Sequence, residues 1–231
     1  MTNWPTKKLG VKKWRQQKSF DAELNFEKFC KERNILCTRL EQVETTRKEF
    51  LKNSNRKCPD FLCSNNGIQI FVEVKTHTLL TNEARDKAMT QIIQAKKSAG
   101  LSGTTIFDPF DPRPELKGVF DGYLRDASRK FKNIKENCKF PRILLLNSHH
   151  ANEFDVQAIF WGAYPSFYQG GEYAGLNKQH RGLFDSTGSN VSAVIYWNDE
   201  QKRFEGRGNS RAIIFLSEGD FKKFFETTTH E

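Results

Sequence analysis

Residues 59–75 read PDFLCSNNGIQIFVEVK and hold two short β-prone runs separated by an Asn-Gly step. Asn-Gly is the strongest short signal for a β-hairpin, because both residues tolerate the positive φ that a tight turn demands. A two-residue turn at Asn66 and Gly67 makes Asn65 the cross-strand partner of Ile68. The stretch therefore predicts an antiparallel hairpin with strands at 59–64 and 68–75.

This register brings three charged side chains to one face of the hairpin. Asp60 falls directly opposite Glu73, and side chains of such a pair lie about 4.5–5.5 Å apart at their Cβ atoms. Lys75, two residues beyond Glu73, shares that face because side chains alternate along a strand. The apolar residues point the other way and supply the core: Phe61, Cys63, Ile68, Ile70, Val72 and Val74.

Two carboxylates this close repel each other unless a positive charge lies between them. Their hard oxygen atoms suit Mg²⁺, which lowers the pKa of a bound water and offsets charge on a phosphodiester. Lys75 would then orient or deprotonate the attacking water, or stabilise the developing negative charge. The alternative is a cross-strand charge cluster on a surface hairpin.

The pattern of Pro59-Asp60, a β-turn and then Glu73-Val74-Lys75 resembles the signature of the PD-(D/E)xK nuclease superfamily. The resemblance covers roughly residues 20–147. It implies a restriction-endonuclease-like αβββαβ core and phosphodiester hydrolysis that depends on Mg²⁺, for which Mn²⁺ substitutes. It also implies that Asp60 and Glu73 hold the metal, that Lys75 is catalytic, and that the substrate is DNA rather than RNA. An endonuclease is favoured over an exonuclease.

The same resemblance implies two further site residues outside the hairpin. Many members carry a Glu on the first helix, where Glu23 and Glu27 both qualify. Glu23 lies nearer the edge of the expected buried stripe and is preferred. A Lys or Gln on a later helix also lines the site in many relatives. Lys130 is the candidate, with Gln91 or Gln94 as alternatives on an earlier helix.

Hydrophobic periodicity predicts an α/β fold with a mixed central sheet flanked by helices. With the family resemblance, we expect residues 20–231 to form a single nuclease-like domain with long loops at 100–122 and 162–190. The expected helices span 20–32, 83–98, 124–138, 153–161 and 220–226. The expected strands span 35–43, 59–64, 68–75, 142–147, 191–197 and 212–216.

The net charge of +9 is concentrated at the start of the 231-residue chain. Residues 1–57 hold 15 Lys and Arg against 7 Asp and Glu. We expect residues 1–19 to form a basic N-terminal arm that contacts nucleic-acid phosphates. The alternative is a solvated tail. The arm residues expected to contact phosphates are Lys7, Lys8, Lys12, Lys13 and Arg15.

Composition excludes several classes of protein. No apolar run approaches the length of about 18 residues that a membrane span requires, and no apolar segment typical of a signal peptide follows the basic N-terminus. Five Cys without framework spacing indicate a reducing compartment, and we expect a cytoplasmic protein. Three alternatives stay open: a homodimer, a subunit that needs a partner chain, and a non-cleaving nucleic-acid-binding module on the same fold.

Overall fold

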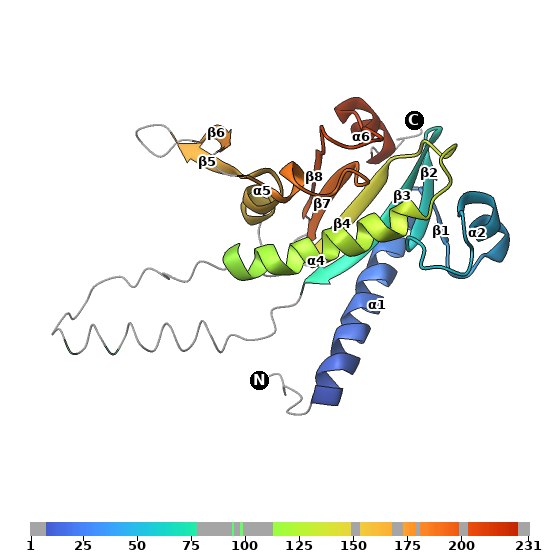
Figure 1. Cartoon of the computed structure of the whole chain (residues 1–231), viewed down its shortest axis with the longest axis horizontal. Coiled ribbons are helices and arrows are strands. Elements are labelled where there is room, and N and C mark those ends of the chain that lie inside the picture. The colour runs from blue at the N-terminus through green and yellow to red at the C-terminus, as the bar shows by residue number, and fades with distance from the viewer. Residues whose placement is uncertain are drawn as a thin grey trace.

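The computed structural model describes residues 8–77, 94, 98, 113–148, 153–167, 173–178, 181–198 and 203–225. Helices lie on both sides of a central sheet, and a small hairpin lies apart from it (Figure 1). The helices are α1 (Lys8–Glu32), α2 (Glu44–Phe50), α4 (Arg113–Lys132), α5 (Glu153–Trp161), the 3₁₀ helix η1 (Leu183–Asp185) and α6 (Glu218–Phe225). The strands are β1 (Leu36–Arg39), β2 (Phe61–Asn65), β3 (Ile68–His77), β4 (Arg142–Ser148), β5 (Ala163–Phe167), β6 (Tyr173–Lys178), β7 (Ala193–Asn198) and β8 (Arg203–Gly208).

The central sheet has six strands in the order β1-β2-β3-β4-β7-β8. β3, β4 and β7 run parallel to one another, and the remaining pairs are antiparallel. The expectation of an α/β fold with a mixed sheet is therefore confirmed. β3 and β4 lie in the middle of the sheet, so the strand that carries Glu73 and Lys75 has hydrogen-bonded neighbours on both sides.

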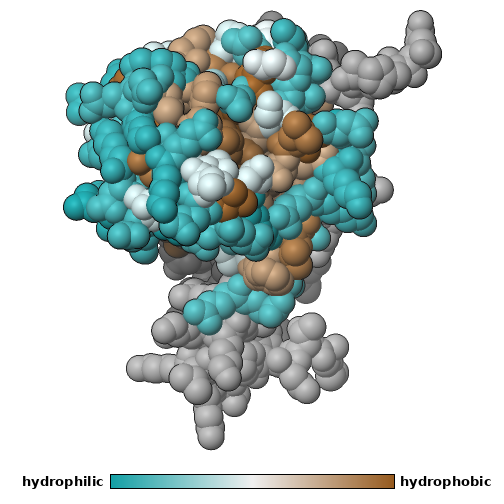
Figure 2. Space-filling model, turned by 90° about the vertical axis from the view of Figure 1, so that its right-hand side faces the viewer, coloured by the Kyte–Doolittle hydropathy of each residue, from teal (hydrophilic) through white to brown (hydrophobic). Residues whose placement is uncertain are grey.

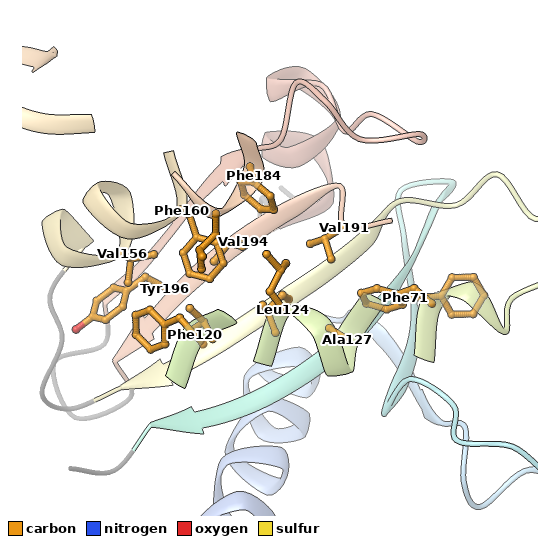
Figure 3. Packing of buried hydrophobic residues seen from close by; sticks show 14 of the residues in the cluster. Phe71, Phe120, Leu124, Ala127, Val156, Phe160, Phe184, Val191, Val194 and Tyr196 are labelled. Carbon is orange, nitrogen blue, oxygen red and sulfur yellow. The ribbon is translucent and has the colours of Figure 1, made fainter. Parts of the chain in front are cut away.

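Two hydrophobic clusters, one on each face, hold helices against the sheet. On one face, α1 and α6 contribute Phe26 and Phe224 to a cluster with Val72. On the other face, α4 and α5 pack over Phe71 and Val194. Figure 3 shows this second cluster, with Phe120 and Leu124 of α4 turned toward the strands. Side chains alternate along β3, so its apolar residues enter a hydrophobic cluster on each face of the sheet. The sequence predicts a core on only one of these faces.

The predicted hairpin is confirmed in its register. Asn65 pairs with Ile68 and Phe61 with Val72, as a two-residue turn requires. Asn66 and Gly67 have φ angles of 49° and 76°, so both adopt the left-handed conformation that this turn needs.

Two predictions for the first 50 residues are wrong in extent. The first helix begins at Lys8 rather than at residue 20, so residues 8–19 continue α1. The strand expected at 35–43 ends at Arg39, and the unpredicted helix α2 follows. β1 lies at the edge of the sheet and pairs only with β2. With no strand on its other side, few backbone hydrogen bonds are available to extend it.

The helix α4 overturns part of the loop expected at 100–122. It starts at Arg113 and ends at Lys132, eleven residues earlier at its start and six residues earlier at its end than the predicted helix at 124–138. Pro114 lies in its first turn, where a missing N–H costs no hydrogen bond, so proline begins this helix instead of breaking it. Residues 100–112 and the helix expected at 83–98 lie outside the described residues, apart from helical Gln94 and Ser98.

The last third of the chain contains further differences. β5 and β6 form a separate hairpin within the region expected to be loop at 162–190. Residues 212–216 form no strand, and the side chains of Ile213 and Phe215 are exposed rather than packed against the sheet. Its place at the sheet edge is taken by β8, whose two glycines hide the alternation that marks a strand. The helix at 153–161 and the strand at 142–147 are confirmed, and β7 and α6 match within two residues at each end.

Hydrophilic residues cover most of the molecular face at the β1 and α2 end, with hydrophobic side chains gathered in its middle (Figure 2). Among the residues that the structure describes, none of the helices combines the length and apolar character that a bilayer span requires.

Candidate active site

Asp60 lies directly before β2, where the ladder between β2 and β3 ends. Its Oδ2 accepts a hydrogen bond of 2.8 Å from the backbone N–H of Val74. The carboxylate therefore replaces the backbone partner that Val74 loses when β2 ends. This bond fixes the side chain beside β3 and leaves Oδ1 free to contact other groups.

Glu73 is the most deeply buried charged group of the site, with an exposed fraction of 0%. Its Oε1 lies 2.6 Å from Nζ of Lys75 and 2.6 Å from Nζ of Lys130. Its Oε2 is buried and has no hydrogen-bond partner among the described residues. A buried carboxylate oxygen without a donor is costly, so the position favours a further cationic or hydrogen-bonding group.

The helix α4 contributes two side chains to the same place. Lys130 reaches Oδ1 of Asp60 at 3.1 Å, and Asp126, one turn earlier, accepts Lys75 at 2.7 Å. Tyr123 on the same helix donates its hydroxyl to the carbonyl of Thr76 at 2.8 Å, which ties α4 to the end of β3. We refer to Asp60, Glu73, Lys75, Asp126 and Lys130 as the carboxylate–lysine cluster.

Burial and neighbouring charge shift several pKa values in this cluster. Burial, followed by the charge of Asp60, raises the pKa of Glu73 to about 7. Burial alone would lower the pKa of Lys130, but Asp60 and Glu73 outweigh it and raise that pKa. The pKa of Lys75 is raised for the same reason, chiefly by Glu73 against burial. Lys130 and Lys75 are therefore cations at neutral pH, and Glu73 titrates there.

Glu23 and Glu27 both project from α1 toward one guanidinium. Arg39 on β1 donates to Glu23 at 2.6 Å and to both oxygens of Glu27, at 2.6 and 3.1 Å. Burial and then the charge of Asp60 raise the pKa of Glu23, although the hydrogen bond and charge of Arg39 oppose this shift. The structure does not bring Glu23 into hydrogen-bond contact with Asp60 or Glu73 among the interactions described, and its catalytic role stays a prediction.

A groove of about 510 Å³ adjoins the carboxylate–lysine cluster. Asp126 and Lys130 line the groove and also belong to the cluster, so the two are continuous. The segment after α2 and the end of α4 form its walls. Its lining includes six cations: Lys52, Arg56, Lys57, Arg129, Lys130 and Lys132.

The other predicted contacts are only partly described. Lys7 and Gln91 lie outside the described residues, and Gln94 is exposed. The backbone of α1 is described at Lys8, Lys12, Lys13 and Arg15, but their side chains are not.

Asp126 and the basic wall formed by residues 52–57 were not predicted from the sequence. A signal for the wall was present, because residues 47–57 hold five basic residues against one acidic residue, immediately before Pro59-Asp60. For Asp126, the only sequence signal is its position one helical turn before Lys130.

Comparison of the chain with protein-family models, with curated proteins and with solved structures found no match.

Proposed function

We propose that this chain is a metal-dependent nuclease of the PD-(D/E)xK type that hydrolyses phosphodiester bonds, with DNA as its substrate. The observation that carries the proposal is the meeting of Asp60, Glu73 and Lys75 on one face, with Lys130 between the two acids. Among the described elements, the order α1-β1-β2-β3-α4-β4, with α2 added after β1, also agrees with the αβββαβ core that the sequence resemblance implies; of residues 78–112, between β3 and α4, only helical Gln94 and Ser98 are described.

The donor set fits Mg²⁺ on two grounds. An ammonium group already bridges Asp60 and Glu73, so the space between these carboxylates accepts a cation. Oε2 of Glu73 is buried without a partner among the described residues, and the cluster holds three carboxylates against two partly buried ammonium groups. Asp60 and Glu73 would hold the metal, which lowers the pKa of a bound water and neutralises charge on the phosphate.

The protein groups have separable roles in this proposal. Lys75 stands beside Glu73 and is held by Asp126, so its ammonium is positioned to orient the attacking water or to stabilise charge on the phosphate. Lys130 holds the two acids together and would give way to the metal. Asp126 acts through Lys75 and is a positioning residue.

The basic groove supplies the path for a polyanion. Each phosphate that a Lys or Arg neutralises releases a counterion, so a cation-lined groove attracts a nucleic-acid backbone. Because the groove is continuous with the cluster through Lys130, a strand lying along it passes the proposed metal ligands.

The test is cleavage of supercoiled plasmid, linear duplex DNA and single-stranded RNA in Mg²⁺, Mn²⁺ and EDTA. We expect cutting of DNA with either metal and none in EDTA. Asp60→Asn, Glu73→Gln and Lys75→Met should each lower the rate by at least about 100-fold. Circular dichroism and urea denaturation with Mg²⁺ present would check that the variants remain folded.

Two results would replace this proposal with its alternatives. Binding with steep salt dependence but no cutting of any substrate would identify a nucleic-acid-binding module. Cutting that begins only when a second chain is added would identify a subunit of a larger enzyme. If Glu73→Gln cuts DNA as fast as the wild type, Glu73 is not a ligand of a catalytic metal and the proposed metal site is wrong.

A further inference from the structure

Three thiols meet on the opposite face of the sheet from the carboxylate–lysine cluster. Cys30 in the last turn of α1, Cys37 on β1 and Cys63 on β2 have sulfur atoms that all lie within 4.8 Å of one another. Cys37 and Cys63 are cross-strand partners, with Sγ atoms 3.4 Å apart. Cys30 and Cys63 are fully buried, and Cys37 is half-buried.

We propose that Cys30, Cys37 and Cys63 bind a zinc ion that fastens α1 to the edge of the sheet. This inference stands apart from the proposed nuclease activity, because it uses none of the residues of that site.

The spacing of the sulfur atoms suits a thiolate metal site. Zn–S bonds of about 2.3 Å in a tetrahedral arrangement place sulfur atoms about 3.8 Å apart. The observed separations, 3.4 Å for one pair and at most 4.8 Å for the others, lie around this value. Binding would release the remaining thiol protons to solvent and would change no oxidation state.

The three thiols differ in their surroundings. Hydrogen bonding within the group lowers the pKa of Cys37 and raises the pKa of Cys30, and burial raises the pKa of Cys63. Half-burial of Cys37 leaves an approach from solvent for a fourth ligand. That ligand would be a water molecule, because both carboxylate oxygens of the nearby Glu27 are held by Arg39.

The location explains what the ion would do. β1 is a four-residue edge strand, and α1 joins it after a short turn, so few backbone hydrogen bonds hold this corner. Zinc would join three elements at one point. β2 is among them, and Asp60 immediately precedes β2, so the clamp would also support one end of the carboxylate–lysine cluster.

The test is metal analysis of the full chain, purified under reducing conditions without chelator. We expect about one zinc ion per chain by elemental mass spectrometry, and a thiolate-to-cobalt charge-transfer band after anaerobic substitution with Co²⁺. The melting temperature Tm should rise by about 5–10 °C with zinc at 100 times its dissociation constant. Cys37→Ser should lose the ion, whereas Cys138→Ser, a buried cysteine outside the group, should retain it.

Three results would overturn the proposal. The first is a folded wild-type chain that retains no zinc after incubation and dialysis and gives no cobalt charge-transfer band. The second is full zinc content in Cys37→Ser. The third is formation of a Cys37–Cys63 disulfide at the same rate with and without zinc. If Cys37→Ser does not fold, the cobalt spectrum of the wild type decides.

Discussion

The ammonium group of Lys130 lies 2.6 Å from Oε1 of Glu73, although one residue belongs to α4 and the other to the centre of the sheet. The same ammonium is 3.1 Å from Oδ1 of Asp60. A protein cation thus bridges the two carboxylates that we propose as metal ligands. Lys130 is the group that allows two acids to lie together at the sheet before any metal binds.

Lys130→Met tests this bridge, because Met retains the aliphatic stem and removes the charge. We expect the free energy of unfolding in EDTA to fall by about 3 kcal/mol, since a buried carboxylate loses its partner. Urea denaturation at pH 8 measures the loss, and Mg²⁺ should reduce it. Lys132→Met, at an exposed position two residues away, is the control. An equal loss of stability in both variants would show that replacing any lysine at this end of α4 has this effect, and that the bridge between the two acids is not its cause.

The pH dependence of stability should report on Glu73, whose pKa of about 7 exceeds the value of about 4.3 for an exposed Glu. Between these values the folded chain holds a proton that the unfolded chain has lost. The free energy of unfolding in EDTA should therefore fall as pH rises from about 4.5 to 7.

The replacement Glu73→Gln removes this contribution. The difference between wild type and variant should change by about 3 kcal/mol across that pH range, measured by denaturation at each pH. Curves that stay parallel from pH 4.5 to 8 would contradict the raised pKa.

Asp126→Asn should show whether Asp126 positions Lys75, which it contacts at 2.7 Å. We expect the cleavage rate to fall about tenfold, less than for Lys75→Met. Loss of the negative charge should also move the limb of the pH–rate profile that reports Lys75 to lower pH. Asp121→Asn, which removes an exposed pair with Arg125 on the same helix, should change neither quantity.

Glu23 and Glu27 form a matched pair, because each loses the same partner, Arg39, when replaced by Gln. If Glu23 assists the metal through water, Glu23→Gln should lower cleavage about tenfold, and Glu27→Gln should leave it within about twofold. Cleavage rates at saturating Mg²⁺ make the comparison. Equal cleavage rates in both variants would indicate that Glu23 and Glu27 serve only to bind Arg39.

The groove predicts a change in the salt dependence of DNA binding. Arg56→Gln with Lys57→Gln should lower the slope of log K against log salt by about 2, since each phosphate contact contributes about 0.9. Fluorescence anisotropy with a short duplex in EDTA measures this slope. Lys28→Gln with Lys31→Gln, at exposed positions on α1, removes the same charge away from the groove. A similar loss in both double variants would indicate general attraction only.

The part of the site that could be predicted lies in the hairpin of β2 and β3, because residues close together in the chain determine its geometry. The Asn66-Gly67 turn determines the register of β2 and β3, so the nearness of Asp60 to Glu73 follows from it, and alternation along β3 puts Lys75 on the same face. Lys130 came from the family resemblance rather than from any spacing. No local rule connects Asp126 with Lys75, because their contact depends on where α4 crosses β3.

The remaining misses have similar physical causes. The prolines within 100–122 predict a loop, whereas Pro114 lies in the first turn of α4, where a helix accepts proline. Cys30, Cys37 and Cys63 come from three elements, and their spacing in the chain matches no common metal motif. Their proximity depends on tertiary packing between α1 and the edge of the sheet.

The central place of β3 divides the cluster into rigid and adjustable parts. Glu73 pairs with Leu144 of β4 and directly follows Val72, the last residue of β3 that pairs with β2, so moving its backbone would disturb the ladders on both sides of β3. Lys75 and Lys130 carry their charges on four-carbon stems that rotate without disturbing the backbone. The carboxylate of Glu73 would therefore stay in place. The side chains of Lys75 and Lys130 would rotate when a cation or a ligand enters or leaves the site.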